Sequence, residues 1–335
     1  MKKYLTILIL FVIILFVIGC NNDKPKNNII SNDKVNDMQP QKTLKGITLT
    51  PKSFQQNDFT DFFEKAKKTG QIITWSGDWI ELSNTNNGGP TVLAELSKQY
   101  DFIPLVIAQF FTQSTGELLR PLDETTKQTY KNSAVAFAEK YKPKYLAFGI
   151  EVNMLWEKSN KDFEDFVVFY DEVYNAIKVI SPNTKIFTIF QLEKMKGLNG
   201  GLFGGINGID KEQWFLIDKF QSDIIVFTTY PGLIYKNPTD IPEDYYEEIK
   251  LHTNKPIAFT EIGWHSKPSP IGWESSEQEQ ADFISKFFLL TNNLNKEFLV
   301  YSFMFDQNTI EPFNSAGLYD QGGTPRLALT EWQKH

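Results

Sequence analysis

The chain has 335 residues, of which 34 are basic and 41 acidic, so its formal net charge is −7. It holds only two arginines and no basic stripe, which argues against a nucleic-acid-binding protein. Its single cysteine, Cys20, excludes an intrachain disulfide and a cysteine-based metal site. Aromatic residues make up 14% of the chain, a share that suits both a large core and sugar-stacking surfaces.

The N-terminus has the pattern of a targeting signal rather than of a folded element. Two lysines precede residues 5–18, which are apolar apart from one threonine and too few for a typical membrane span. The following Val-Ile-Gly-Cys (17–20) resembles a bacterial lipobox. We therefore expect residues 1–19 to be a cleaved signal peptide and Cys20 to carry a lipid, which anchors the protein to the extracytoplasmic side of the cell membrane. The alternative is an uncleaved N-terminal anchor.

Residues 20–43 predict a disordered tether. They are rich in Asn, Lys, Asp and Gln and hold few large apolar side chains, so they cannot bury enough surface to fold. Such a segment would hold a domain away from the membrane. The rest of the chain, residues 44–335, has the length of a single α/β barrel domain.

Eight strand-like runs recur along residues 44–335, and most are almost continuously apolar, as parallel strands covered on both faces are. They are Leu44–Thr50, Gln71–Trp75, Phe102–Gln109, Tyr145–Glu151, Lys185–Gln191, Asp223–Tyr230, Pro256–Glu261 and Phe298–Phe305. Helix-like segments with an apolar face lie between most of these runs. The clearest are Asp58–Lys68, Thr125–Tyr141, Lys161–Ile180 and Ser276–Leu290.

This alternation of strands and helices predicts an α/β fold, namely a single-domain (β/α)8 TIM barrel. The alternative is an open doubly wound sheet. A Gly-x-Gly-x-x-Gly turn after the first strand would favour such a sheet, and the sequence has none there.

Two glutamates end predicted strands: Glu151 ends the fourth and Glu261 the seventh. A carboxylate at the end of a buried strand is costly unless it faces a polar site. In a TIM barrel, the carboxyl ends of the strands form the active site. The pair therefore suggests a matched acid and nucleophile. The alternative is two structural carboxylates bridged to lysines at the barrel rim.

Four segments carry a resemblance to a known enzyme group. They are Phe-Gly-Ile-Glu-Val-Asn (148–153), Thr-Tyr-Pro (229–231), Phe-Thr-Glu-Ile-Gly-Trp-His-Ser (259–266) and Ala-Gly-Leu-Tyr-Asp (316–320) with Gly-Thr-Pro-Arg (323–326). In this order they resemble the clan of retaining glycoside hydrolases with a (β/α)8 barrel, whose acid/base ends strand four and whose nucleophile ends strand seven. The resemblance spans residues 46–335, and within the clan it is closest to the endo-β-mannanase and endo-galactanase families.

The resemblance implies that Glu261 is the nucleophile and Glu151 the acid/base. Tyr230 would orient Glu261, and its hydrogen bond would favour the ionised carboxylate. Glu151 would be kept protonated by its apolar flanks and by the negative charge of Glu261. A retaining double displacement requires the two carboxyl groups to lie roughly 5–5.5 Å apart.

The sequence departs from the clan at two places. Most members carry an asparagine before the acid/base, where it binds the sugar hydroxyl next to the cleaved bond, and here this residue is Ile150. Asn153 is then the candidate for contacting that hydroxyl. The eighth strand ends in Phe-Met-Phe-Asp (303–306), where many relatives have a tryptophan.

Other candidate sugar contacts lie at or just after predicted strand ends, where tryptophan faces can stack on sugar rings and where carboxylates and amides can bind hydroxyls. They are Trp75, Asp78, Trp79, Gln109, Gln191, Trp264 and Asp306. Packing in the core is the alternative for each tryptophan. Because the three histidines lie far apart in the chain, we expect no catalytic metal, and we expect no cofactor.

These features predict a lipid-anchored cell-surface glycoside hydrolase that cleaves a β-linked poly- or oligosaccharide with retention. Its expected partners are the carbohydrate substrate and, through Cys20, the membrane; we expect a monomer that does not bind nucleic acid. The main alternative is a catalytically degenerate barrel that binds glycan without hydrolysis, and Ile150 favours it. A third is a solute-binding lipoprotein, which would show two α/β lobes rather than one cycle of eight strands.

Overall fold

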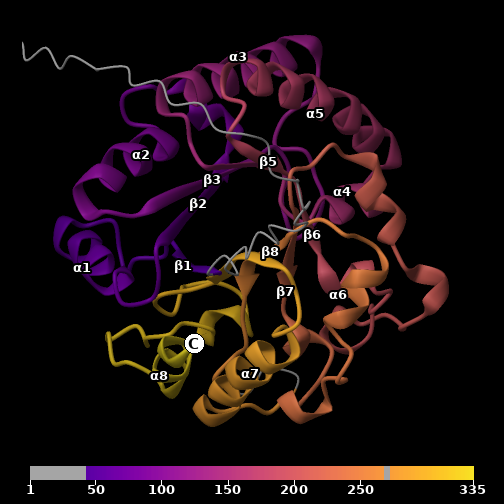
Figure 1. Ribbon diagram of the computed structural model, residues 1–335. Coiled ribbons are helices and arrows are strands. Elements are labelled where there is room, and N and C mark those ends of the chain that lie inside the picture. The colour runs from indigo at the N-terminus through magenta and orange to yellow at the C-terminus, as the bar shows by residue number, and fades with distance from the viewer. Residues whose placement is uncertain (1–42, 268–271) are drawn as a thin grey trace, which may run out of the picture. The chain divides into compact units, whose positions relative to one another are not determined.

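The computed structural model describes residues 43–267 and 272–335 (Figure 1). The predicted signal peptide, the expected lipidation site Cys20 and nearly all of the predicted tether lie outside the described residues. Among the described residues, no helix is both long and apolar enough to cross a membrane.

The described residues contain one sheet of nine strands, and every neighbouring pair is parallel. The strands are β1 (Leu44–Thr48), β2 (Ile72–Asp78), β3 (Ile103–Gln109), β4 (Tyr145–Phe148), β5 (Lys185–Phe187), β6 (Ile189–Gln191), β7 (Ile225–Thr229), β8 (Ile257–Ile262) and β9 (Lys296–Tyr301). Their order in the sheet is β5-β4-β3-β2-β1-β9-β8-β7-β6. Figure 1 shows these strands around a central axis, with helices outside them.

The strands β5 and β6 are two halves of the predicted fifth strand. Only Thr188 separates them, and its hydroxyl donates a 2.8 Å hydrogen bond to the carbonyl of Phe148. The first half pairs with β4 and the second half with β7, so the two ends of the sheet belong to one stretch of chain. The eight predicted strands are therefore all present, and the predicted TIM barrel is confirmed.

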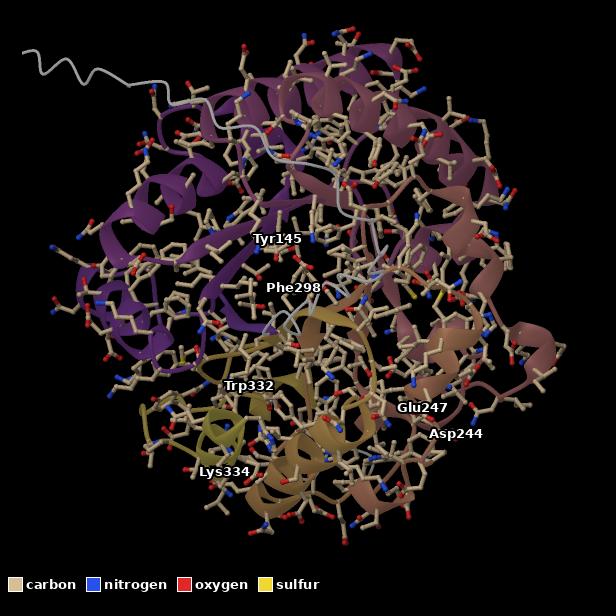
Figure 2. All side chains as sticks on the ribbon, viewed as in Figure 1. Tyr145, Asp244, Glu247, Phe298, Trp332 and Lys334 are labelled. Atoms are coloured by element: carbon tan, nitrogen blue, oxygen red, sulfur yellow. The ribbon has the colours of Figure 1, made fainter. Side chains whose placement is uncertain are left out.

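Alternate strand positions point into the barrel and fill it with side chains, as in other TIM barrels. Tyr145 from β4 and Phe298 from β9 meet in this interior, with ring centroids 4.8 Å apart (Figure 2). The Tyr145 hydroxyl donates to Glu297 at 2.7 Å, and Lys185 pairs with the same carboxylate oxygen at 2.7 Å. The barrel interior is thus a packed core, and a ligand site is expected at an end of the barrel rather than inside it.

The helices of the described residues are α1 (Gln56–Ala66), α2 (Gly89–Tyr100), α3 (Glu124–Tyr141), α4 (Val152–Lys158), α5 (Asn160–Ile180), α6 (Leu192–Met195), α7 (Glu277–Leu290) and α8 (Leu327–Lys334). The four helices predicted most clearly correspond to α1, α3, α5 and α7, with ends shifted by a few residues. Ser276 caps α7, because its hydroxyl accepts a 3.2 Å hydrogen bond from the amide of Glu279.

Two connections between strands are irregular rather than helical. After β6 the chain makes the single turn of α6 and then short 3-10 turns, and between β7 and β8 it makes 3-10 turns alone. The first connection is rich in glycine over residues 197–208, and the second has prolines at positions 231, 238 and 242. Both residue types disfavour a continuous α-helix. Their irregular backbone leaves these segments to shape the mouth of the barrel.

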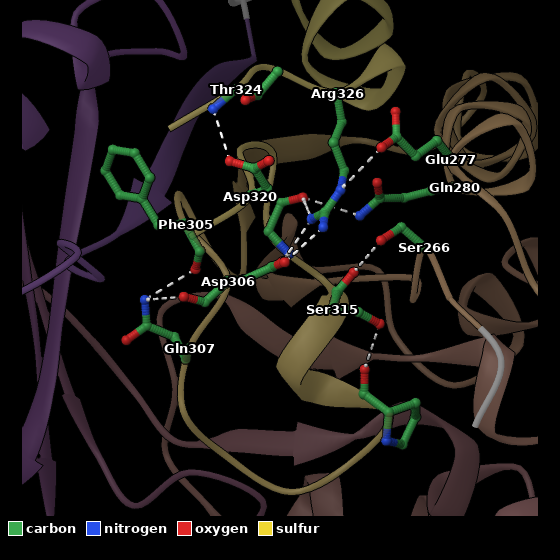
Figure 3. A network of polar contacts seen from close by, with 12 residues as sticks. Ser266, Glu277, Gln280, Phe305, Asp306, Gln307, Ser315, Asp320, Thr324 and Arg326 are labelled. Carbon is green, nitrogen blue, oxygen red and sulfur yellow. Dashed lines mark hydrogen bonds and ion pairs between the residues drawn. The ribbon is translucent and has the colours of Figure 1, made fainter. Parts of the chain in front are cut away.

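A buried ion pair anchors the long loop after β9. Both guanidinium Nη atoms of Arg326 donate to the carboxylate of Asp306 at 2.5 Å, and the amide of Gly317 donates to the same carboxylate at 3.1 Å (Figure 3). Glu277 lies 3.7 Å from the Arg326 Nε atom. Asp306, expected to bind sugar, therefore has its carboxylate engaged in holding the base of this loop.

Arg326→Met should lower the free energy of unfolding by about 3–5 kcal/mol, because it leaves the Asp306 carboxylate buried without its partner. The side chains of this pair are only 2% and 4% exposed. Arg120→Met is the matched control: Arg120 also pairs with Asp78 through both of its Nη atoms, but those side chains are 32% and 28% exposed. The control should lose roughly 1 kcal/mol. Urea unfolding measures both values, and equal losses would contradict a special role for the buried pair.

Candidate active site

A cavity of about 990 Å³ opens at the carboxyl ends of the strands, the end of a TIM barrel at which catalytic residues gather. Four of the residues predicted from the sequence line this cavity: Glu151, Gln191, Tyr230 and Glu261. Its apolar wall comes from the two irregular connections and from the loop after β9, and it includes Leu202, Phe203, Leu233, Phe303, Ile310 and Phe313. The two candidate catalytic glutamates therefore meet in one cavity, as the barrel prediction required.

The backbone at Glu151 is strained. β4 ends at Phe148, so Glu151 follows the strand rather than ending it, which corrects the expectation from the sequence. Gly149 has φ +79°, and Glu151 has φ +56° and ψ +48° at the start of α4. Residues other than glycine avoid this left-handed region, and such exceptions cluster at functional sites. This tight turn places the Glu151 carboxyl in the cavity instead of at the tip of the strand.

The Glu151 carboxyl lies in an environment that favours its neutral form. The residue is 5% exposed, and the Thr228 hydroxyl donates to its Oε1 atom at 2.7 Å. Burial, followed by the negative charge of Glu261, raises the pKa of Glu151 from its ordinary value of 4.5 to about 8. A carboxyl group with this pKa keeps its proton at neutral pH.

Glu261 lies within β8, and a register shift directs it into the cavity. Pairing with β7 skips one residue after Phe259, so Glu261 rather than Thr260 pairs with Thr228. The Tyr230 hydroxyl donates to Glu261 Oε2 at 2.6 Å. Burial raises the pKa of Glu261, while hydrogen bonds from Tyr230 and from Gln113 lower it in part. The expected influence of Tyr230 on the ionised form is thus present, although burial outweighs it.

The two carboxyl oxygens of Glu261 differ in their hydrogen bonds. Its Oε2 atom receives Tyr230, and the side-chain amide nitrogen of Gln113 lies 3.5 Å from the same oxygen. Within residues 43–267 and 272–335, no side chain or backbone group donates a hydrogen bond to its Oε1 atom. The Oε1 atom is therefore the oxygen that is free to react with a ligand.

Tyr230 is held at both its ends. Its hydroxyl lies 2.8 Å from the Ser302 hydroxyl, which itself donates to the carbonyl of Ile262 at 3.0 Å. Its backbone amide donates at 3.0 Å to the side chain of Glu193. Glu193 is completely buried and also accepts from the hydroxyls of Thr229 and Tyr245, at 3.0 and 2.9 Å. This support holds Tyr230 against Glu261.

Two side-chain amides that were predicted to contact sugar, those of Asn153 and Gln109, instead form hydrogen bonds with the backbone. Asn153 is completely buried, accepts from the amide of Gln191 at 3.0 Å and donates to its carbonyl at 3.2 Å. Gln109 is also buried and accepts from the amide of Ile150 at 3.1 Å. These bonds fix the chain after β6 and after β4. Gln191 itself lines the cavity, and its Oε1 atom is buried with no hydrogen-bond partner in the described structure.

The three predicted tryptophan contacts lie outside the cavity with the glutamates. Trp79 is completely buried and stacks on Tyr130, with ring centroids 4.9 Å apart. Trp264 is buried against Phe283 at 5.2 Å and donates from its indole nitrogen to Ser275 at 3.1 Å. Trp75 lines a separate, mostly apolar cavity of about 350 Å³. The structure gives Trp79 and Trp264 the packing role that the sequence left open.

The two predicted acidic sugar contacts are both engaged with arginines: Asp78 pairs with Arg120 and Asp306 with Arg326, each at 2.5 Å. Asp306 also borders a separate polar cavity of about 330 Å³. Among the described residues, no group of three or more His, Cys, Asp or Glu side chains could hold a metal ion. The expectation of metal-free chemistry stays a prediction.

Sequence reasoning missed two residues beside the glutamates, Gln113 and Glu193. Gln113 follows β3 in a loop whose sequence, Phe-Phe-Thr-Gln-Ser (110–114), has no local sign of a site. Glu193 had a usable signal, because it comes two residues after Gln191 at the end of an apolar run. An acidic residue at that place fits the same argument that singled out Glu151 and Glu261.

No family model matches the chain, and no curated protein matches it. Solved structures do. A family 39 glycoside hydrolase from the gut symbiont Bacteroides cellulosilyticus WH2 superimposes with a TM-score of 0.59 at 16% identity, over 87% of this chain and 62% of that one. Bacteroides uniformis beta-glucuronidase 2, in a structure covalently bound to cyclophellitol-6-carboxylate aziridine, superimposes with a TM-score of 0.60 at 12% identity, over 87% of this chain and 34% of that one. Ruminococcus gnavus beta-glucuronidase superimposes with a TM-score of 0.54 at 14% identity, over 87% of this chain and 50% of that one.

These likenesses show that the chain has the barrel fold found in several glycoside hydrolases. The chain spans between about a third and two thirds of the length of those three proteins. At such low identity, the likeness concerns the fold alone, so the activity has to be argued from the cavity.

Glu151→Gln should stabilise the protein much more at pH 8 than at pH 5. Well below pH 4.5 the carboxyl group is neutral in both the folded and the unfolded chain. As the pH rises towards 8 the unfolded chain ionises while the folded chain keeps the proton, so folding stability is lost, by about 1.4 kcal/mol per unit of pKa difference. Glutamine cannot ionise and escapes this loss.

Thermal unfolding at pH 5 and pH 8 measures this effect. The matched control is Glu139→Gln, which makes the same change on the exposed face of α3 and should move the melting temperature equally at both pH values. A Glu151→Gln protein that gains no more at pH 8 than at pH 5 would contradict the raised pKa of Glu151.

Proposed function

We propose that the protein is a glycoside hydrolase that cleaves a β-linked poly- or oligosaccharide by a retaining double displacement. One observation carries the proposal: two glutamates share the cavity at the carboxyl ends of the strands, and their surroundings differ. The neutral form of Glu151 can donate a proton, and Glu261 has one oxygen free for attack. This is the division of labour that glycoside hydrolysis requires.

In the first step, Oε1 of Glu261 attacks the anomeric carbon while Glu151 gives its proton to the departing glycosidic oxygen. Tyr230 holds the other oxygen of Glu261 and so sets the direction of attack. The products of this step are a glycosyl ester on Glu261 and an ionised Glu151. The carboxyl separation of roughly 5–5.5 Å that a direct attack needs stays a prediction.

In the second step, Glu151 takes a proton from a water molecule, which attacks the ester and releases the sugar. The exchange of roles has a physical cause. When Glu261 becomes an ester it loses its negative charge, and that charge is one of the causes of the raised pKa of Glu151. The pKa of Glu151 therefore falls in the intermediate, and the former acid becomes the base.

Two substrate classes follow from different observations. The sequence resemblance favours β-mannans and β-galactans. The alternative is a glycan with a carboxylate, because Lys194 lines the cavity and an ammonium group has three donors. Among the described residues, Lys194 donates to a single carboxylate, that of Glu157, at 3.0 Å. Two of the similar structures are described as beta-glucuronidases, which makes this class worth testing.

The competing proposal is a barrel that binds glycan without cleaving it. The Ile150 side chain favours it, because this residue is completely buried in the barrel interior and cannot contact a sugar. The environments of Glu151 and Glu261 favour hydrolysis, because a binding site gains nothing from a carboxyl group held neutral beside a second one.

Hydrolysis is tested by incubating the soluble domain, residues 44–335, with β-mannan, β-galactan, β-glucan, β-xylan and a β-linked uronan, and following new reducing ends. Release of reducing ends from at least one polymer is the expected result. Binding to a polymer without release, detected by affinity electrophoresis, would instead support the degenerate barrel.

Glu261→Ala and Glu151→Ala should each fold and each lose most of the hydrolysis of the substrate identified, by at least about 100-fold for a lost nucleophile or acid. Azide should partly restore Glu151→Ala on an aryl glycoside with an activated leaving group, because that group departs without a proton. The measurement is initial rate with and without azide. Near-wild-type rates in both variants would show that the glutamates are not catalytic.

We also propose that the enzyme is anchored to the cell membrane through a lipid on Cys20, which lies outside the described residues. The support is the lipobox-like sequence that ends at this cysteine. Cys20→Ser should block both lipid attachment and signal cleavage, so the variant should keep the mass of the uncleaved chain. The intact mass of the membrane fraction is the measurement. A wild-type protein of uncleaved, unmodified mass would show an N-terminal anchor instead.

A further inference from the structure

We propose that Gln113 binds the sugar hydroxyl next to the anomeric carbon and so replaces, from the loop after β3, the asparagine absent at position 150. The inference rests on the proposed hydrolase function and names a substrate-positioning residue for it. Four observations carry it: the exclusion of the expected residues, the place of Gln113 beside Glu261 in the cavity shared with Glu151, the way its loop is held, and the free donors of its amide.

The residues expected to contact this hydroxyl cannot reach it. Ile150 is completely buried among the side chains that fill the barrel, and its backbone amide is already bonded to Gln109. Asn153 is also completely buried, and both ends of its amide are engaged by the backbone of Gln191. The chain after β4 therefore supplies the acid Glu151 but no donor beside it for the sugar.

Gln113 lies where such a donor is needed. Its side chain lines the cavity, and its amide nitrogen is 3.5 Å from Oε2 of Glu261. Glu151 lines the same cavity, and the Gln113 side chain lowers the pKa of its carboxyl in part. A side chain that contacts Glu261 in the cavity shared with Glu151 should lie beside the anomeric carbon, since Glu261 attacks that atom and Glu151 protonates the oxygen leaving it.

A small hairpin holds Gln113 in this place. Phe111 and Leu118 pair as an antiparallel bridge, and the amide of Thr112 donates to the carbonyl of Glu117 at 2.8 Å. Gly116, at φ +69°, lets the hairpin lie against α4, because a Cβ atom there would come within 2.4 Å of the carbonyl oxygen of Met154. Gln113 sits at the tip of this hairpin, so its amide is positioned before a substrate arrives.

The bond that Gln113 makes to Glu261 is weak and leaves donors free. At 3.5 Å it is at the limit of a hydrogen bond, and among the described residues this amide nitrogen has no second hydrogen-bond partner within that distance. A hydroxyl beside the anomeric carbon can accept from this amide and donate to Oε2 of Glu261. Hydrogen bonds to that hydroxyl strengthen as positive charge develops in the transition state, so Gln113 should raise kcat more than it lowers KM.

The test compares two proteins on two substrates. The proteins are the wild type and Gln113→Ala; the substrates are whichever para-nitrophenyl β-glucoside, β-galactoside or β-mannoside is hydrolysed fastest, and its 2-deoxy counterpart. On the hydroxylated substrate, Gln113→Ala should lower kcat by about 100-fold, the size found for losing one transition-state donor. On the 2-deoxy substrate the same change should cost less than about threefold, because the hydroxyl is already missing.

Two controls separate this role from a structural one. Gln278→Ala removes an equivalent amide from the exposed face of α7 and should leave both rates unchanged. If Gln113 only held Glu261, its loss would slow both substrates equally and move the acid limb of the pH profile, since its hydrogen bond lowers the pKa of Glu261. Equal losses on the two substrates would overturn the inference while leaving the hydrolase function intact.

Failure of the proposed function gives a different result. If the wild type hydrolyses none of the three glycosides, the same comparison is made with binding, by calorimetry of the wild type and Gln113→Ala with each glycoside and its 2-deoxy form. A preference for the hydroxylated sugar that disappears in Gln113→Ala supports the contact. An unchanged preference, or no preference in the wild type, overturns it.

Discussion

The structure depends on the confinement of two carboxyl groups in one buried cavity. Glu151 and Glu261 share low-polarity surroundings, in which two negative charges cannot both be accommodated. Because burial and the charge of Glu261 raise the pKa of Glu151 to about 8, one proton stays on the pair at neutral pH. The proposed roles of acid and nucleophile rest on this constraint, and so does the loss of stability expected as the pH rises.

Holding the two groups in place requires support from several elements of the barrel. Thr228 donates to Glu151, Tyr230 donates to Glu261, and Glu193 beneath them receives the backbone amide of Tyr230. The left-handed backbone of Glu151 adds local strain. Such strain persists only where the surrounding packing outweighs it, and here the packed barrel interior and the bonds of Asn153 and Gln109 supply that support. The barrel thus maintains an arrangement that these residues would not adopt alone.

The fold was predictable because its signal is repeated along the chain. Eight apolar runs of strand length, separated by amphipathic segments, correspond to the observed strands, and a misjudged strand end such as that of β4 does not disturb the count. The glutamates were predictable because a carboxylate at the end of a buried apolar run is costly unless it faces a polar site. The sugar contacts were less predictable. Sequence position placed Trp79, Trp264 and Asn153 near strand ends, but only tertiary packing decides which side chains at a strand end face the cavity. Gln113 had no local signal, because its role arises from a hairpin that brings a loop to carboxylates far along the chain.

The central claim is that Glu261 forms a covalent bond to the sugar. The direct measurement is the intact mass of the wild-type domain after incubation with an activated 2-deoxy-2-fluoro glycoside of the sugar that it hydrolyses, followed by peptide mapping. The account predicts one sugar per protein, attached to the peptide that contains Glu261, and release of that sugar as activity returns. A protein that hydrolyses the parent glycoside but acquires no adduct, or acquires one on another residue, would contradict it.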